Sequence, residues 1–464
     1  MSHRSLFVSF AVTSLLNYVF SLAASRLLTS GDFGLLGVAQ AIVLVASLIL
    51  FTGVPWSLAR SIAVEEPIRR HPLIRGAVVA NVALAGIIGG VIVVLFAAGP
   101  FRAAFESWAI VAAVAGTLPF FAIVAIARAA AQGYARFSRL AGLQLAEVTS
   151  KVVAGLLLAA LGFGAIGATL GFFVGALVGA CLGIATLVVT FGVRPIGPVA
   201  MVSPRSAGAM FGALLGLALL LNEDLLAVKL FGGNRALAGY YQAALMLANV
   251  PYFLVSSTLV PVLFTRVSRH STISETWASV ADVLRVAVVF VIPFEIVLAI
   301  RPVEVLAFFL PAKYAASAPL LQVMAIGNAA VIVTVILSAA FQAIGRAAVP
   351  AMILLVTCLV EGVTLAIVVP DLQAAGAVIV FATAAVASLI VTAGAYIREA
   401  NVHIDARAAA WILRLAAASI MGVAVGNAVG GAILSIVVAG LVYFSLVFAL
   451  GIVAPRLTPL LERT

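Results

Sequence analysis

Charged residues are scarce in this sequence. Aspartate, glutamate, lysine and arginine make up 9% of its 464 residues, while hydrophobic residues make up 65%; roughly 25% of the residues of a soluble domain are charged. So little charge excludes a soluble globular protein and indicates a polytopic membrane protein. The net charge of +10 is therefore interpreted first through the membrane, and we expect no nucleic-acid partner.

Residues that catalyse reactions or hold metals are also few. The two cysteines, Cys181 and Cys358, both lie in apolar runs, which argues against a disulfide framework and a cysteine metal site. The four histidines are scattered, and the sequence has no glycine-rich phosphate loop and no Ser/His/Asp or Cys/His set of the kinds that carry catalysis. We therefore expect no enzyme activity, no catalytic residue, no metal and no cofactor.

Apolar runs of about 20 residues, the length that crosses a bilayer, fill most of the sequence. The polar stretches between them are short, so no soluble domain is expected. The first run is too long for the core of a signal peptide. The runs predict about fourteen membrane helices, at approximately 6–28, 34–58, 75–99, 107–131, 140–161, 165–191, 206–231, 236–262, 281–301, 316–343, 347–369, 373–397, 408–428 and 430–453.

The basic residues predict the orientation. Most of the 26 lysine and arginine residues lie on the same side of the predicted helices as the N-terminus. Cytoplasmic loops of membrane proteins carry an excess of positive charge. We therefore predict a multi-pass protein of the inner (plasma) membrane with both termini in the cytoplasm, and an even number of helices.

Short motifs recur along the chain at a nearly constant offset. Asn17 and Asn222 are 205 residues apart, as are Gly34 and Gly239. Three further matches follow in the same order: "VPWSLAR" (54–60) with "VPVLFTR" (260–266), "QGYAR" (132–136) with "QAIGR" (342–346), and "GAIGA" (164–168) with "QAAGA" (373–377). Five ordered matches are hard to assign to chance, so the chain is predicted to contain an internal repeat.

The repeat predicts the fold class. Each repeat holds six helices, an even number, so both halves have the same orientation in the membrane. We expect an all-α membrane protein of two six-helix bundles, 1–200 and 201–400, related by a pseudo-twofold axis along the membrane normal. An additional helix pair, 401–464, lies outside the repeat.

Several longer segments, among them "SRLLTSGDFGLLGVAQAI" (25–42) and "YARFSRLAGLQLAEVTSKVVAGLLLAALGFGAIGATLGFFVG" (134–175), have a familiar pattern of glycine, aromatic and apolar residues. They resemble the polysaccharide-transporter branch of the multidrug/oligosaccharidyl-lipid/polysaccharide exporter superfamily, over about residues 1–400. That superfamily includes Wzx-type O-unit flippases, lipid II flippases and, more distantly, drug/cation antiporters. The resemblance implies that the first, second, seventh and eighth helices line a central cavity that opens alternately to each side.

Three predicted helices carry polar side chains on one face. Polar groups are costly in lipid, so these stripes predict a cavity lining; the alternative is hydrogen bonding between helices. The stripes comprise Ser14, Asn17, Ser21 and Ser25 in the first helix, Gly37, Gln40 and Ser47 in the second, and Gln242, Asn249, Tyr252 and Ser256 in the eighth.

Four basic residues are candidates to bind a phosphate-bearing substrate. Arg26 and Lys229 lie at the predicted outer ends of the first and seventh helices, and the repeat partners Arg60 and Arg266 lie at the inner ends of the second and eighth. Arginine binds phosphate bidentately, and lysine acts as a point charge. The alternative for Arg26 and Lys229 is snorkelling to the interface; for Arg60 and Arg266 it is the ordinary positive-inside signal.

Two adjacent acids, Glu223 and Asp224, follow Asn222 inside the predicted seventh helix. Asn222 has a repeat partner of the same type, whereas the acids have none. We therefore predict that Asn222 lines the cleft and that one acid, Asp224 in preference to Glu223, binds a coupling proton or sodium ion. The alternative is an acid held neutral or paired with a neighbouring helix.

Other charged residues suggest contacts within the bundle. Glu147 and Lys151, four residues apart in the fifth helix, are predicted to neutralise each other. Asp32 and Arg235 lie in repeat-related outer loops and are predicted to pair and close an outer gate. Glu295 and Glu361 are single intramembrane acids, either proton sites or protonated groups bonded across helices.

Taken together, these features predict a flippase that moves a polyprenyl-pyrophosphate-linked oligosaccharide, a polysaccharide or lipopolysaccharide precursor, from the cytoplasmic to the outer leaflet by alternating access. The expected partners are that lipid-linked glycan, membrane lipids, a coupling proton or sodium ion, and a glycan polymerase or glycosyltransferases. The alternatives are a proton- or sodium-coupled drug or cation antiporter on the same fold and an integral-membrane glycan polymerase or ligase. A scaffold that recruits glycosyltransferases is disfavoured by the short loops.

Overall fold

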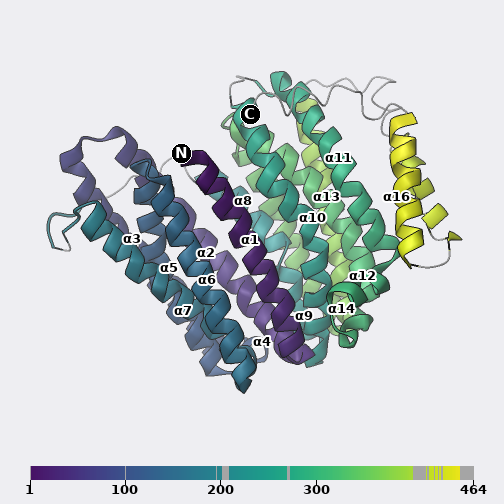
Figure 1. Ribbon diagram of the computed structural model, residues 1–464, viewed down its shortest axis with the longest axis horizontal. Helices are drawn as coiled ribbons and strands as arrows, with labels where there is room; N and C mark the ends of the chain where they lie inside the picture. The colour runs from purple at the N-terminus through teal and green to yellow at the C-terminus, as the bar shows by residue number, and fades with distance from the viewer. Residues whose placement is uncertain are drawn as a thin grey trace. The chain divides into compact units, whose positions relative to one another are not determined.

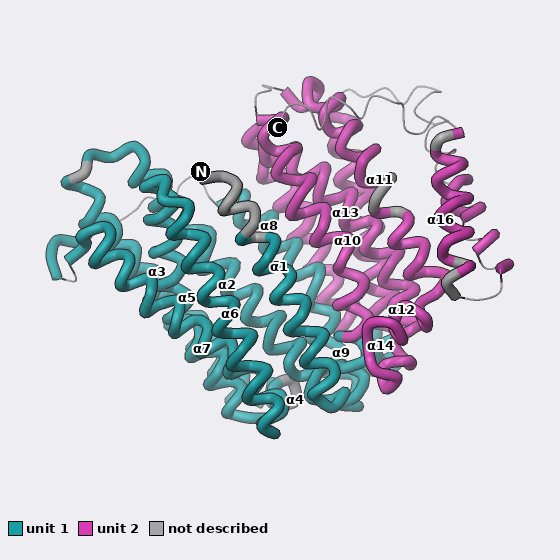
Figure 2. Tube along the Cα trace, in the orientation of Figure 1, with its two compact units in different colours: residues 1–242, 366–374 teal, residues 243–365, 375–464 magenta. Residues whose placement is uncertain are grey.

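The computed structural model describes residues 2–99, 101–194, 196–200, 208–268, 272–400, 414, 417–422, 424–426, 428–429 and 432–449. Every regular element within these residues is helical (Figure 1), which confirms the predicted all-α class. The chain forms two compact units (Figure 2). The first comprises Met1–Gln242 and Ala366–Ala374, and the second Ala243–Leu365 and Ala375–Thr464.

The first unit contains the helices that carry most of the predicted site residues. α6 packs against α1 and α7, while α5 packs against α2, α3 and α7. Two π-helical turns, Ala159–Phe163 and Thr186–Thr190, follow α6 and α7. The helices are α1 (Ser2–Leu27), α2 (Ser30–Val64), α3 (Pro67–Ala97), α4 (Arg102–Phe105), α5 (Trp108–Gly133), α6 (Phe137–Leu158), α7 (Gly164–Ala185), α8 (Gly208–Leu220), α9 (Glu223–Phe231) and the start of α10 (Arg235–Val267).

The second unit begins at Ala243, within α10. It has its own apolar core, in which Phe341 and Tyr396 are buried. Residues 366–374 of α14 belong to the first unit. The predicted span 408–428 lies partly outside the described residues. The other helices are α11 (Trp277–Ile300), α12 (Pro302–Phe309), α13 (Ala318–Ala343), α14 (Ala348–Ala400) and α16 (Ala432–Ala449), with 3-10 turns at Ser274–Thr276 and Ala312–Ser317.

Apolar length explains most of these helices. Within the described residues, seven helical stretches are long and apolar enough to cross a membrane, or eight if the bent pair α8–α9 forms one span. Two of the seven, Phe137–Thr190 and Ala348–Ala400, contain 54 and 53 residues, and each has a backbone break where the sequence predicts two spans. The protein is thus a multi-pass membrane protein, while fourteen crossings, the division at residues 200 and 400 and the separate pair 401–464 stay predictions.

The backbone repeats where the sequence motifs repeat. Gly164 (φ 55°, ψ −139°) and its partner Gln373 (φ 52°, ψ −137°) share one unusual conformation. Ala135 and its partner Gly345 both have positive φ, and each is followed by an arginine whose N–H reaches back five residues, 2.7 Å for Arg136 and 2.8 Å for Arg346. Matching conformations at matching offsets support the internal repeat.

The backbone of Gln373 has a positive φ that is strained for any residue other than glycine. A non-glycine residue in such a region costs about 1–3 kcal/mol, and glycine occupies the equivalent position 164 without that cost. We expect Gln373→Gly to raise the midpoint of thermal unfolding of the purified protein in detergent. Gln373→Ala is the control, because alanine keeps the strain, and a glycine variant no more stable than the alanine variant would contradict the prediction.

Candidate functional site

The polar segment 222–224 lies at a break in the helical chain. α8 ends at Leu220, α9 begins at Glu223, and the two are bent by 42°. The side-chain amide of Asn222 donates to the carbonyl of Ala218, 2.8 Å away, where α8 ends. Acids in the first turn of a helix interact favourably with its positive dipole end. The expectation of one continuous helix over 206–231 is therefore wrong, and the break accounts for the position of both acids.

The two acids have different surroundings. Asp224 is 0% exposed, and its carboxylate accepts hydrogen bonds from the Tyr241 hydroxyl at 2.6 Å and the Leu225 N–H at 2.7 Å. Glu223 is half-buried and, with Asn222, lines an apolar pocket of about 200 Å³ formed by residues of α2, α3, α8 and α9. Asp224 is thus held by a phenol and its own helix, whereas Glu223 faces a pocket.

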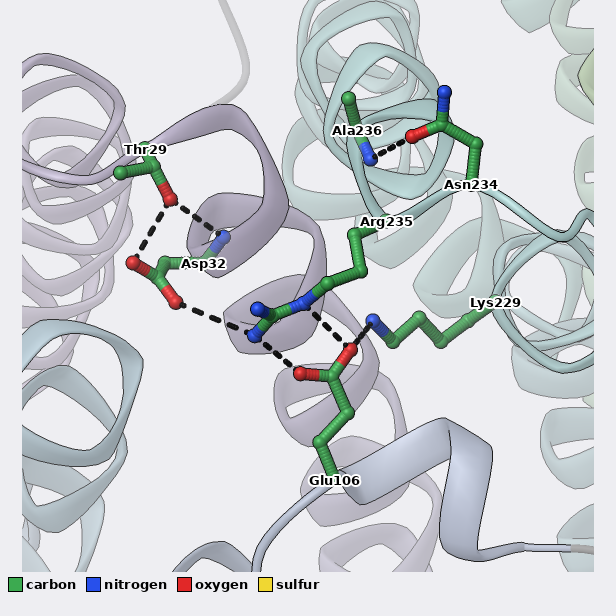
Figure 3. A network of polar contacts seen from close by, with 7 residues as sticks. All are labelled: Thr29, Asp32, Glu106, Lys229, Asn234, Arg235 and Ala236. Atoms are coloured by element: carbon green, nitrogen blue, oxygen red, sulfur yellow. Dashed lines mark hydrogen bonds and ion pairs between the residues drawn. The ribbon is translucent and has the colours of Figure 1, made fainter.

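A carboxylate from a loop, Glu106, lies at the centre of an ionic network near the start of α10 (Figure 3). It caps α4 in a left-handed conformation, φ 56°. Its carboxylate pairs with the Lys229 ammonium and both oxygens contact the Arg235 guanidinium, one through Nε at 2.9 Å. The Lys229 side chain is only 3% exposed, whereas Arg235 is 63% exposed. Glu106 therefore neutralises a buried lysine and anchors an exposed arginine.

Asp32 reaches the same network from α2. Its carboxylate lies 4.0 Å from Arg235, so the predicted Asp32–Arg235 pair is present, though Glu106 makes the closer contact. Thr29, the N-cap of α2, accepts the Asp32 N–H at 3.1 Å and donates its hydroxyl to the Asp32 carboxylate at 2.8 Å. We call Asp32, Glu106, Lys229 and Arg235 the ionic cluster.

Sequence reasoning missed Glu106. It is a lone acid in a short loop, and nothing in its spacing predicts that it meets Lys229 and Arg235, more than 120 residues away. The available signal was the scarcity of acids and bases on that side of the predicted helices. Lys229, predicted to bind substrate phosphate, is neutralised by Glu106 in this structure.

Two glycines let α2 and α10 approach each other beside this cluster. A methyl group added to Gly34 would collide with the backbone of Ala238 and Gly239, and one added to Gly239 would collide with the Ser30 carbonyl. One helical turn further, a methyl group at Gly37 would meet the Gln242 side chain. Gly34 and Gly239 are repeat partners, so the equivalent ends of the two repeats are in backbone contact.

The predicted residues of α1 and α2 lie at several places in the first unit. The Ser21 hydroxyl donates to the Asn17 carbonyl at 3.3 Å within α1. The Asn17 side chain is exposed and accepts a hydrogen bond from Lys151. Arg26 and Arg60 are exposed near the ends of their helices, and Gln40 is half-buried.

The remaining predicted residues lie on α10. Gln242 and Asn249 are each 8% exposed, and the Asn249 amide oxygen accepts no hydrogen bond from the described residues. Arg266 is half-buried in the last turn. Gln242 belongs to the first unit, and Asn249 and Arg266 to the second. The first unit therefore brings together Asn222 with Glu223, and Lys229 with Arg235, while Asn17 joins a separate contact.

Glu147 interacts electrostatically with Lys151, as predicted, but its close ion pair is with another residue. Its carboxylate accepts from Arg128 of α5 at 2.7 Å, because a partner on the adjacent helix lies closer than the one on its own. Glu295 and Glu361 are buried, on α11 and α14.

Comparisons with solved structures show which proteins share this fold. The lipid II flippase MurJ in an inward closed conformation matches with a TM-score of 0.72 at 13% identity, over 95% of this chain and 98% of that one. An inward-facing multidrug resistance MATE family transporter of the MOP superfamily matches with a TM-score of 0.60 at 14% identity, over 86% and 96%. The chain therefore has the all-α two-lobe fold of these proteins.

A comparison with protein families gives a second result. The model of the polysaccharide biosynthesis protein family matches residues 4–271, more than half of the chain. The chain therefore belongs to the polysaccharide biosynthesis protein family. Among curated proteins, none matches it.

Proposed function

We propose that this protein is a membrane flippase that moves a polyprenyl-pyrophosphate-linked oligosaccharide from the cytoplasmic to the outer leaflet of the plasma membrane. The chief support is the combination of the polysaccharide biosynthesis family with a fold that the lipid II flippase MurJ shares over 95% of this chain. In this proposal both termini are cytoplasmic, as the distribution of basic residues indicates. Membrane lipids and a glycan polymerase or glycosyltransferases are its proposed partners.

The ionic cluster is the proposed outer gate. It joins the beginning of α2, the loop after α4, the end of α9 and the beginning of α10, which belong to both sequence repeats. In an alternating-access cycle, separation of these elements breaks the ion pairs and frees Lys229 and Arg235. Lys229 is then available to an anionic head group leaving on the outer side, while Arg60 and Arg266 serve the cytoplasmic side.

Other predicted residues complete the proposed path. Asn17, Ser21, Arg26 and Gln40 come from α1 and α2, and Asn222, Gln242 and Asn249 from the equivalent helices of the second repeat. Their polar groups replace water around the sugar hydroxyls, and Arg26 meets phosphate. Such hydrogen bonds compensate the cost of moving polar groups through an apolar interior.

The proposed coupling site is Asp224, with Glu223 as the second candidate. We expect Asp224→Asn to remove the dependence of flipping on a proton or sodium gradient and to destabilise the protein by about 1–3 kcal/mol, since the single amide oxygen replaces two acceptor oxygens and leaves one buried donor without its acceptor. Tyr241→Phe loses one of the same hydrogen bonds but keeps the acid, so it retains gradient dependence. The measurement is flipping in proteoliposomes with imposed gradients. Unchanged gradient dependence in both Asp224→Asn and Glu223→Gln would refute the coupling role.

A depletion experiment tests the function itself. Cells depleted of the protein should accumulate a lipid-linked oligosaccharide on the cytoplasmic leaflet and lose the corresponding surface glycan. Re-expression of the wild-type chain should reverse both effects. Unchanged lipid-linked intermediates and surface glycans, together with increased sensitivity to cationic drugs, would instead support an antiporter, the alternative favoured by the MATE likeness.

A further inference from the structure

Lys151 is an intramembrane cation whose expected partner is occupied elsewhere. Glu147, one turn before it, pairs with Arg128. The Lys151 ammonium donates instead to the side-chain oxygen of Asn17 and lies 4.7 Å from the ring centre of Phe172 and 5.5 Å from that of Phe20. Among the described residues, no carboxylate forms an ion pair with it. Its charge is therefore stabilised at close range by an amide carbonyl dipole and two aromatic faces, and from further away by the Glu147 carboxylate.

The surrounding helices hold this ammonium in place. A Cβ at Gly171 would lie 2.6 Å from the Lys151 carbonyl oxygen, and one at Gly175 would lie 2.7 Å from the Lys151 Cβ. These two glycines let α7 lie directly on α6 and bring Phe172 over the lysine. Phe20 and Phe172 are buried, whereas Lys151 is half-buried and Asn17 is exposed. The two buried rings therefore cover one side of the Lys151 ammonium, and the lysine remains partly exposed on the other.

The charge at position 151 is specific to the first repeat. Arg136 and Arg346, the arginines that start the equivalent helices, are 210 residues apart, whereas Gly164 and Gln373 are 209 apart. The π turn Ala159–Phe163 lies between them in the first repeat and accounts for the one extra residue, because a π turn is wound more widely than an α turn. Lys151 precedes that turn, so its repeat partner is Glu361. A cation in one repeat and an acid in the other argue that packing of the shared scaffold does not require either charge.

We propose that Lys151 binds the phosphate group of an anionic lipid-linked substrate. A lysine ammonium has three N–H donors, of which Asn17 takes one, so the others are available to phosphate oxygens. The substrate class is a polyprenyl phosphate or pyrophosphate carrying sugars. This assignment rests on the proposed function and adds to it a binding residue in α6, outside the helices from which the cavity was predicted.

The test compares the binding of two lipids by the purified full-length protein in detergent. Undecaprenyl pyrophosphate carries the anionic group, and undecaprenol has the same tail without it; inorganic pyrophosphate serves as a competitor that lacks the tail. The variants are Lys151→Met and Lys151→Gln, which remove the charge, and Lys151→Arg, which keeps it. Gln144→Leu is the matched control, because Gln144 donates to the Thr13 hydroxyl at 3.0 Å across the same α1–α6 contact and carries no charge.

We expect Lys151→Met and Lys151→Gln to weaken binding of undecaprenyl pyrophosphate by about 10- to 100-fold, the effect of losing a hydrogen bond to a charged group. Binding of undecaprenol should be unchanged, and Lys151→Arg and Gln144→Leu should resemble the wild type. Equal binding of the pyrophosphate lipid by wild type and either neutral variant would overturn the assignment, as would equal losses for both lipids. A wild-type protein that binds neither lipid would contradict the proposed function itself. If only one neutral variant folds, the comparison is made with that variant.

Discussion

Replacing Glu106 with glutamine is expected to destabilise the first unit by about 3–5 kcal/mol, the range for a buried charge that loses its partner. The variant removes the carboxylate that pairs with both Lys229 and Arg235. Arg235 is exposed and can return to water, but the Lys229 side chain is 3% exposed and cannot do so without moving. The measurement is the midpoint of thermal unfolding of the purified protein.

Two further variants separate charge pairing from other effects. Glu106→Gln combined with Lys229→Met should recover much of the lost stability, because replacing both members of a buried pair by neutral groups is far less costly than breaking it. Asp282→Asn is the surface control, since Asp282 and Arg285 are 45% and 49% exposed and exposed pairs contribute at most about 1 kcal/mol. A Glu106→Gln variant no less stable than Asp282→Asn would refute the role given to Glu106.

A methyl group at Gly239 is expected to have the second large effect. It would collide with the Ser30 carbonyl, so the backbones of α2 and α10 must separate. Overpacking of this kind costs about 1–3 kcal/mol, and a displaced α10 would also move Arg235 away from Asp32. We therefore expect Gly239→Ala to lower both the midpoint of unfolding and glycan export.

Gly90→Ala provides the control for this substitution. Gly90 lies within α3, and a methyl group there meets nothing within 4 Å. Alanine favours a helix over glycine by about 1 kcal/mol, so this variant should be as stable as the wild type or more so. If Gly239→Ala also proved neutral, the close approach of α2 and α10 would not constrain the fold as argued here.

The helices could be predicted because apolar length is a strong signal in a membrane protein. The predicted run 107–131, for example, corresponds to α5, Trp108–Gly133. The repeat could be predicted from five short matches, and one matched pair, Gly164 and Gln373, shares an unusual backbone conformation in the structure. Apolar length and repeated motifs can be read from the sequence without knowing which helices pack together.

The charged contacts could be predicted only in part. Asp32 and Arg235 were paired through the repeat, whereas Glu106 has no repeat-related clue and depends on how a loop folds over α9 and α10. Glu147 has an apparent partner on its own helix, but the packing of α5 against α6 supplies Arg128 as its close ion pair. The break before Glu223 lies within a long apolar run. The polar segment 222–224 is the feature of that run that coincides with the break.

The π turn Ala159–Phe163 lies where the two halves of the chain differ in length. The first repeat has one residue more than the second between the matched positions 136 and 164, and this π turn lies within that interval. Lys151 before the turn and Gly171 after it are in contact, so the turn accommodates its extra residue without separating α6 from α7. The two copies were thereby free to change length and charge independently, which is a route by which a duplicated, symmetric ancestor becomes a protein with two distinct halves.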